Sequence, residues 1–323
     1  MKKTLATTKL GLITISISLV SGLTAAAIPS ELKLDYAYYA PTSLVVKEQK
    51  LLEKALPKTK IKWVFSQGSN RSLEYLNSGS TDFASTAGLA AVLSRANGSP
   101  IKTVYVQSQP EWTALVVNKD SNIKSLKDLK GKKIAATKGT DPFLFTLQAL
   151  DTVGLGKRDV ELVHLQHPDG KTALERKQVD AWAGLDPLMA SAQVQSGAKL
   201  LYRNIGFNSY SVLSIKENFA KQSPEAVDAV IKVYEQARKW AKANPDKLAE
   251  LLAREAKLPI EVAKLQLSRT NLDQNIPTAK HIAALQKAGS ILTEEDLVRK
   301  GTNVNQVVTQ LFDSKYAQKV VKK

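Results

Sequence analysis

The segment at residues 128–140 reads DLKGKKIAATKGT, and its pattern indicates the fold class. The short segment at 133–136 is apolar after its first residue, which is typical of a buried strand, and the polar turn Lys138-Gly139-Thr140 follows it closely. The next apolar run, 143–153, is long enough for a helix. A strand, a small polar turn and a helix in this order form one unit of an α/β fold with a parallel sheet.

The same unit recurs on both sides of this segment. We expect a first series of strands at 32–36, 61–65, 83–85 and 101–106, with helices at 43–56, 69–77 and 89–96. A second series has strands at 115–117, 133–136, 160–165, 180–184 and 199–202, with helices at 143–153, 171–176 and 188–196. From about residue 224 onward the pattern is helical, most clearly at 226–243, 246–256 and 279–288. The sequence therefore predicts two α/β lobes, each with a mainly parallel sheet flanked by helices.

The first 27 residues have the features of a cleavable export signal. Lys2, Lys3 and Lys9 accompany an apolar run at 10–23, and the small residues 25–27 precede Ile28. The run has about 14 residues, fewer than the roughly 20 that span a bilayer. The chain contains no cysteine, so neither a disulfide nor a lipid-modified N-terminal cysteine can form. We expect cleavage after residue 27 and a mature protein that diffuses freely in the periplasm.

The formal net charge of +16 raises the question of nucleic-acid binding. The basic residues are scattered along amphipathic helices, for example at 237–242, and no dense run or nucleic-acid module is present. We therefore expect a solvated basic surface that attracts anionic solutes, and no nucleic-acid partner. The composition, 43% hydrophobic and 24% charged, is that of a globular chain with a full core.

The sequence patterns of common catalytic sites are missing. No serine has glycine at both second neighbours, and no cysteine can act as a nucleophile. Gly170-Lys171-Thr172 resembles the end of a phosphate loop, but Leu165 stands where such a loop begins with glycine. His164 and His167 lack the further ligands of a metal site, so we interpret them as satisfied or cleft-facing histidines, with metal binding as the alternative. We expect no cofactor and no catalysis.

Three polar turns each follow a predicted strand and lead into a helix: 66–69, 85–88 and 138–140. In open parallel sheets ligands bind at the carboxyl ends of the strands, and the first N–H groups of a helix can hold an anion. The alternative is that these serines, threonines and glycines only form turns and N-caps. Three such turns in the same topological position favour a binding site.

Six segments, in this order and at these spacings, carry a resemblance to a known family: 61–65, 73–83, 120–133, 138–140, 179–182 and 186–187. The chain resembles the exported type II substrate-binding proteins of ABC importers, in particular the aliphatic-sulfonate, taurine and nitrate group. The resemblance implies two lobes that close on a small anion and deliver it to a membrane permease powered by a separate ATPase. It also implies one lobe from 28–117 plus 209–323 and a second lobe from 118–208. From the two-lobe organisation we expect a monomer.

The candidate ligand-binding residues lie on the polar turns and beside them. We expect donors to the anionic group at Thr86, Gly88, Gly139 and Thr140, a polar contact at Gln67, and a positive charge at Lys138. The candidate walls for an organic tail are Tyr38, Tyr39, Trp112 and Phe143. The polar turns and the residue that follows the third turn add Gly68, Ala87 and Asp141, and the segment 186–187 adds Asp186.

Asp141 stands where the family has a small residue. A carboxylate is favoured at a helix N-terminus, but it repels a sulfonate bound to the same N–H groups. Either Asp141 caps the helix, with Pro142 as its first residue, or the ligand carries a cationic or donor group, as an aminosulfonate does. The alternative ligands for such a receptor are a nitrate-like anion or a cationic or neutral compound. The alternative function is that of an enzyme on the same fold, which would resemble the thiamine-pyrimidine synthases.

Overall fold

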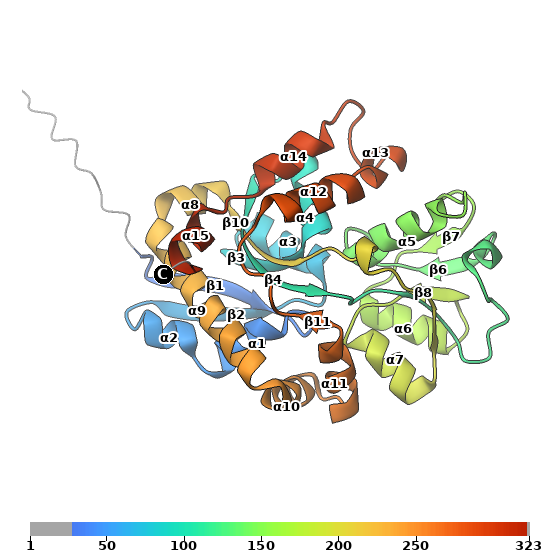
Figure 1. Ribbon diagram of the computed structural model, residues 1–323, viewed down its shortest axis with the longest axis horizontal. Coiled ribbons are helices and arrows are strands. Elements are labelled where there is room, and N and C mark those ends of the chain that lie inside the picture. Colours follow the sequence, from blue (N-terminus) through green and yellow to red (C-terminus); the bar gives the residue numbers. More distant parts are fainter. Residues whose placement is uncertain (1–27, 322–323) are drawn as a thin grey trace, which may run out of the picture.

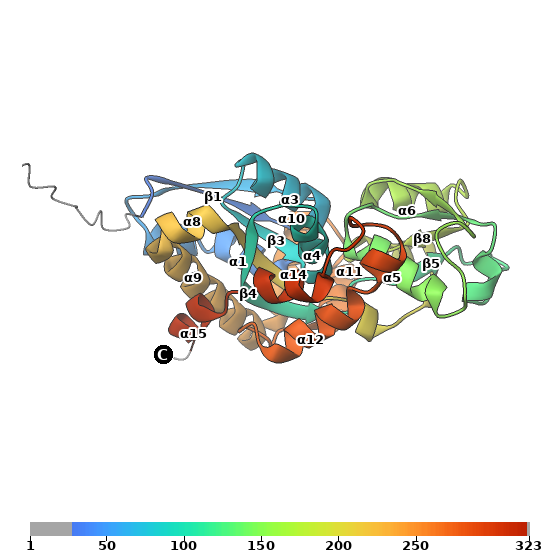
Figure 2. The same ribbon diagram turned by 90° about the horizontal axis from the view of Figure 1, so that it is seen from above.

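The computed structural model describes residues 28–321, which form two α/β lobes that lie along its long axis (Figures 1 and 2). The predicted export signal lies outside the described residues. We call the part around the six-stranded sheet the larger lobe and the part around the five-stranded sheet the smaller lobe. The predicted two-lobed α/β fold is confirmed.

The sheet of the larger lobe has the order β11-β4-β10-β3-β1-β2. Its strands are β1 (Glu31–Tyr36), β2 (Lys60–Phe65), β3 (Phe83–Ala87), β4 (Ile101–Pro110), β10 (Ser211–Lys216) and β11 (Thr270–Asn271). The strand β1 pairs in parallel with β2 and β3, but β10 runs antiparallel between β3 and β4. Because β10 returns from the smaller lobe, it enters the sheet from the end at which β4 leaves it. The sheet is therefore mixed, whereas the sequence predicts a mainly parallel one.

The sheet of the smaller lobe has the order β7-β6-β8-β5-β9. Its strands are β5 (Leu115–Val117), β6 (Lys133–Ala135), β7 (Glu161–Val163), β8 (Ala181–Ala183) and β9 (Lys199–Tyr202). The strand β6 is parallel to β7 and β8, whereas β5 is antiparallel to β8 and β9. Since β5 pairs here, the chain has already left the larger lobe before residue 115, earlier than the sequence-based division at 117. We call 111–114 the first crossover and 203–210 the second crossover.

Helices cover both sheets (Figure 1). Those of the larger lobe are α1 (Pro41–Glu48), α2 (Leu51–Ala55), α3 (Ser69–Ser78), α4 (Gly88–Ala96), α8 (Glu217–Gln222), α9 (Pro224–Ala243), α10 (Pro245–Ala256), α11 (Ile260–Ser268), α12 (Ala279–Ala288), α13 (Ile291–Glu294), α14 (Val304–Leu311) and α15 (Lys315–Val321). The smaller lobe has α5 (Asp141–Asp151), α6 (His167–Glu175), α7 (Leu188–Ser196) and the 3-10 turn Leu126–Leu129, and a second 3-10 turn, Ile205–Phe207, lies in the second crossover. The sequence predicts one helix at 43–56, but Lys50 adopts a left-handed conformation (φ 51°) and separates α1 from α2.

Sequence-local features start several of these helices. Pro41, Pro142, Pro168, Pro224 and Pro245 each lie in the first turn of a helix, where the missing N–H is not needed. One hydrophobic cluster runs through both lobes, because it joins α4 and α12 of the larger lobe to α5 of the smaller lobe. Among residues 28–321, no helix has both the length and the hydrophobicity that a membrane span requires.

Candidate functional site

A cavity of about 180 Å³ lies between the two lobes. The larger lobe lines it with Tyr38, Tyr39, Phe65, Ser66, Gln67, Ala256 and Leu258, and the smaller lobe with Pro168, Leu185, Asp186, Pro187 and Leu188. Most of these residues follow the carboxyl ends of β1, β2 and β8. This is the position at which α/β proteins bind ligands.

Aromatic side chains form one wall of the cavity. The ring centroids of Tyr38 and Phe65 are 4.6 Å apart. The Tyr39 hydroxyl donates to the carbonyl oxygen of Ser85 at 2.9 Å, and its ring packs edge-to-face on Trp112 at 5.9 Å. Trp112 supports Tyr39 from behind and does not line the cavity. These contacts hold the aromatic wall in place before any ligand arrives.

A buried carboxylate behind the cavity holds the loop that carries Ser66. Asp35 accepts hydrogen bonds from the hydroxyls of Ser66 (2.8 Å) and Ser72 (2.5 Å) and from the backbone N–H of Ser85 (2.7 Å). Burial raises the pKa of Asp35 to about 6, although these donors act in the opposite direction. Asp35 thus ties β1 to the start of α3 and to β3.

Helix α3 begins beside the cavity, where the two lobes touch. Its first N–H groups lack intrahelical partners and carry partial positive charge, and Gln67 lies just before them. Gly68 faces His167 of the smaller lobe so closely that a Cβ on Gly68 would lie 2.7 Å from His167 Nε2. Across the same boundary, Asn70 Nδ2 donates to Gln166 Oε1 at 3.4 Å. The start of α3 is therefore both a candidate anion site and a contact between lobes.

The turn at 85–88 directs its donors into the protein. The N–H of Gly88 donates to the carbonyl of Tyr210 at 2.8 Å, and the N–H of Ala87 donates to a serine hydroxyl of α3 at 2.8 Å. Thr86 is fully buried, and its hydroxyl lies 3.4 Å from that of Ser214 within the sheet. Thr86, Ala87 and Gly88 do not line the cavity.

The turn at 138–140 also lies outside the cavity lining. Lys138 is exposed, and the hydroxyl of Thr140 donates to the carbonyl of Thr137 at 2.6 Å. Gly139 has φ of 79°, a conformation that favours glycine, so the turn geometry accounts for this residue. Phe143 is buried in the core between the lobes.

Asp141 connects α5 to both crossovers. Its Oδ2 accepts hydrogen bonds from the N–H (2.8 Å) and hydroxyl (2.7 Å) of Ser209 and from Trp112 Nε1 (3.3 Å). The side chain does not line the cavity, and burial raises its pKa to about 6. This arrangement favours a structural role for Asp141 over contact with a ligand.

Asp186 brings a carboxylate to the cavity wall. Its Oδ1 accepts from the N–H of Ala190 at 2.9 Å, and its Oδ2 lies 3.4 Å from Nη1 of Arg269 in the larger lobe. Burial raises the pKa of Asp186 to about 6, while Arg269 opposes this effect. No motif of the sequence indicated Arg269, which is 83 residues away from Asp186.

The two histidines of the smaller lobe do not form part of a metal cluster. Within residues 28–321 no group of three or more histidine, cysteine, aspartate or glutamate side chains is placed to hold a metal ion. His167 is fully buried with Nδ1 3.1 Å from the Thr137 hydroxyl, and burial lowers its pKa to about 3.

The cavity between the lobes is suited to hold an organic group by contact with its apolar side chains, and it also offers polar groups such as Ser66 and Gln67.

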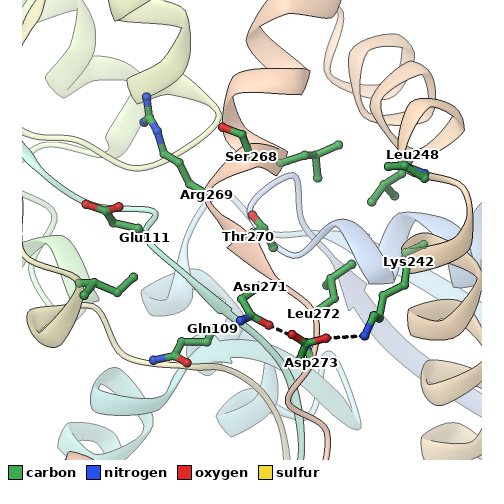
Figure 3. A pocket seen from close by; sticks show the side chains of 14 residues that line it. Gln109, Glu111, Lys242, Leu248, Ser268, Arg269, Thr270, Asn271, Leu272 and Asp273 are labelled. Atoms are coloured by element: carbon green, nitrogen blue, oxygen red, sulfur yellow. Dashed lines mark hydrogen bonds and ion pairs between the residues drawn. The ribbon is translucent and has the colours of Figure 1, made fainter.

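A second hollow, of about 620 Å³, lies beside the two crossovers (Figure 3). Its charged lining residues are paired: Lys242 with Asp273, Glu111 with Arg203 at 2.6 Å, and Arg269 with Asp186 at 3.4 Å. It lies beside α9–α11 and β11, all parts of the larger lobe, and is more open than the cavity between the lobes. We therefore regard the cavity of about 180 Å³ between the lobes as the candidate ligand site.

The cavity brings together four of the expected site residues, Tyr38, Tyr39, Gln67 and Asp186, and Gly68 directly follows Gln67 in the chain. It does not include Thr86, Ala87, Gly88, Trp112, Lys138, Gly139, Thr140, Asp141 or Phe143. Sequence reasoning missed the lining residues Phe65, Ser66, Pro168, Leu185, Pro187, Leu188, Ala256 and Leu258. The turn at 66–69 and the Asp186-Pro187 loop gave a signal for their neighbours, but nothing in the pattern of the C-terminal helices pointed to Ala256 or Leu258.

Comparisons with known proteins agree with this architecture. The model of the family described as NMT1/THI5 like matches residues 60–248, which is more than half of the chain. A protein of Escherichia coli (strain K12) that carries the name aliphatic sulfonates-binding protein is 28% identical over 87% of this chain and 89% of its own. A protein of Bacillus subtilis (strain 168) with the same name is 30% identical over 84% of this chain and 83% of its own.

A solved structure shows the same likeness. The alkanesulfonate-binding protein of Xanthomonas axonopodis pv. citri, bound to MOPS, superimposes with a TM-score of 0.82 at 26% identity. The match covers 89% of this chain and 99% of that protein. With a family model that spans both lobes and relatives that match nearly the whole described chain, this protein belongs to the NMT1/THI5-like family.

Proposed function

We propose that this protein is the periplasmic receptor of an ABC importer and that it binds a sulfonate-type organic anion. The observation that carries the proposal is a cavity lined by both lobes, in a chain whose fold follows an alkanesulfonate-binding protein over 89% of its length. The two relatives named for aliphatic sulfonates support the same ligand class. These relatives are named as binding proteins, so we expect the bound solute to be released unchanged.

The ligand has one apolar part and one anionic part, and the cavity offers a place for each. The organic chain lies between Tyr38 and Phe65 on one side and Leu185 and Leu188 on the other. The sulfonate lies near Gln67 at the start of α3, where unpaired N–H groups and the helix dipole stabilise an anion. Asp141 is engaged with Ser209, which favours a plain alkanesulfonate over an aminosulfonate.

Closure of the lobes links binding to transport in this proposal. The larger lobe comprises residues 28–110 and 211–321, and the smaller lobe comprises residues 115–202. Rotation about the two crossovers traps the solute and presents both lobes together to a membrane permease, whose ATPase partner supplies the energy. The receptor itself acts as a monomer.

Calorimetric titration tests the ligand class. Protein freed of solute by unfolding and refolding in phosphate buffer is titrated with ethanesulfonate, MOPS, taurine and nitrate. We expect ethanesulfonate to bind with a dissociation constant on the order of micromolar, and nitrate to bind much more weakly.

Matched variants locate the site. The Phe65→Ala variant should weaken ethanesulfonate binding, because it removes part of the aromatic wall. The Asp273→Asn variant, in the second hollow, should bind as the wild type does. Absence of binding by ethanesulfonate, MOPS and taurine at millimolar concentration contradicts the proposed ligand class, and recovery of a chemically altered solute contradicts the receptor function.

A further inference from the structure

Arg269 extends from the larger lobe into the smaller lobe. It follows α11 and directly precedes β11, which pairs with β4 in the sheet of the larger lobe. Its guanidinium contacts two side chains of the smaller lobe, Asp186 through Nη1 (3.4 Å) and Gln193 of α7 through Nη2. Figure 3 shows the side chain of Arg269 pointing away from Asn271, which lies on β11, and from Asp273, which lies in the loop after β11.

The ion pair between Arg269 and Asp186 is buried. The side chains are 8% and 1% exposed, so solvent does not screen their charges as it does at the protein surface. A buried pair of this kind is sensitive to the loss of one partner, because the remaining charge is left uncompensated. Asp186 lines the cavity between the lobes, so separation of the lobes would expose it to water.

The backbone of Arg269 is attached to the first crossover. Its carbonyl accepts a hydrogen bond from the N–H of Glu111 at 2.8 Å. The carboxylate of Glu111 in turn receives two hydrogen bonds from Arg203 of the second crossover, at 2.9 and 2.6 Å. Arg269 is therefore connected to both crossovers and to the wall of the cavity.

We propose that Arg269 is a positioning residue that favours the closed arrangement of the lobes by neutralising Asp186 and holding α7 against α11. The planar guanidinium can contact Asp186 and Gln193 at the same time, which a lysine ammonium on one stem does less well. Neutralisation also removes the repulsion that a bare carboxylate on the cavity wall would exert on an anion. Only this second consequence rests on the proposed function, since the contact between the lobes consists of protein groups alone.

The distance between the lobes can be measured without any ligand. Because the chain has no cysteine, two nitroxide labels can be attached to cysteines introduced at Glu74 of α3 and Glu161 of β7. Both side chains are exposed, at 58% and 61%. Double electron–electron resonance then reports the distribution of distances between the larger and the smaller lobe in ligand-free protein.

We expect Arg269→Gln to move the distance distribution away from that of the wild type, toward separated lobes. Arg269→Lys should give an intermediate distribution. Adding Asp186→Asn to Arg269→Gln should restore part of the wild-type distribution, because the uncompensated carboxylate is then gone. Lys242→Gln is the matched control, because Lys242 pairs with Asp273 inside the larger lobe, and it should leave the distribution unchanged.

A wild-type distribution for Arg269→Gln overturns the proposal. If that variant does not fold, Gln193→Ala takes its place, since it removes the other contact and leaves the ion pair intact; an unchanged distribution then has the same meaning. A separate titration with ethanesulfonate should show roughly 10-fold weaker binding by Arg269→Gln, the effect of a smaller closed population. Failure of ethanesulfonate to bind the wild type contradicts the proposed function alone, because the distance measurement contains no ligand.

Discussion

Gly68 shows how one missing side chain permits contact between the lobes. Its φ of −178° is extended backbone that any residue adopts, so conformational freedom does not explain the glycine. The explanation is the buried imidazole of His167, which leaves no room for a Cβ in this arrangement. The need for glycine therefore arises only when the two lobes are together.

A Gly68→Ala substitution should weaken ligand binding and leave the fold of each lobe intact. The added methyl group overpacks the contact with His167, which costs about 1–3 kcal/mol of binding free energy if closure accompanies binding. Titration of ethanesulfonate into wild type and variant measures the loss. The double variant Gly68→Ala/His167→Ala makes room for the methyl group and should recover much of the affinity. Equal affinity of Gly68→Ala and the wild type would show that the lobes do not approach here when the ligand binds.

At the level of single residues, the sequence predicted positions better than roles. It indicated Tyr38, Tyr39, Gln67 and Asp186 because they follow strands, and strand ends in α/β folds meet at the cleft. It placed Thr86 and Thr140 there for the same reason, but their hydroxyls are directed to neighbours within the protein. The direction of a side chain depends on residues distant in sequence, such as Ser214 beside Thr86, which a local pattern does not contain.

Among the secondary-structure elements, β1, β3 and α3 meet at a single carboxylate. Asp35 on β1 binds the hydroxyl of Ser72 on α3 and the N–H of Ser85 on β3, and it also holds Ser66 on the loop before α3. Because Ser66 lines the cavity, this interior network sets one edge of the candidate site. Its charge is buried, so its energetic contribution depends on pH.

The Asp35→Asn variant should show this pH dependence. The pKa of Asp35 rises from 3.8 in the unfolded chain to about 6 in the folded protein, because burial disfavours the charged form. The folded state then binds more protons between pH 4 and 6, and the stabilisation from the protonated form is lost as the pH rises through about 6. Relative to Asp35→Asn, the wild type should lose up to about 3 kcal/mol of unfolding free energy between pH 4 and 7.

Urea unfolding of both proteins at pH 4, 5, 6 and 7 measures this difference. The amide of Asp35→Asn also changes the hydrogen bonds to Ser66 and Ser72, but the free energy of this change does not depend on pH. Only the change with pH of the difference in unfolding free energy between the two proteins therefore tests the pKa. A difference that stays constant across this range, or that grows in favour of the wild type as the pH rises, contradicts the shifted pKa.

The sequence predicted most of the elements because their signals are local. The alternation of strands and helices, the turns that end them and the prolines that start them all lie within a few residues. The break at Lys50 was missed, because the run 43–56 keeps a helical pattern through it. The sequence did not predict the strand β10, since its place in the sheet depends on pairing with β3 and β4, which precede it by more than 100 residues.

In the whole molecule, several contacts join the two lobes at widely separated points of the boundary between them. Besides Gly68 with His167 and Arg269 with Asp186, Lys157 of the smaller lobe lies 3.6 Å from the carboxylate of Glu295 in the larger lobe. Asp141 adds a link between α5 and both crossovers. These contacts describe a closed arrangement, in which both lobes line the candidate cavity.

Small-angle X-ray scattering should distinguish this closed arrangement from the ligand-free protein. Because closure encloses the solute, ethanesulfonate binds the closed form better and shifts the population toward it by its difference in affinity for the two forms. The scattering profile of protein saturated with ethanesulfonate should match that of the structure for residues 28–321, and protein freed of solute should have a larger radius of gyration. The Gly68→Ala variant serves as the control, because its lobes should close less completely at the same ligand saturation. Identical profiles with and without ligand would mean that the lobes keep a fixed arrangement, and capture of the solute would then have to occur without rotation about the two crossovers.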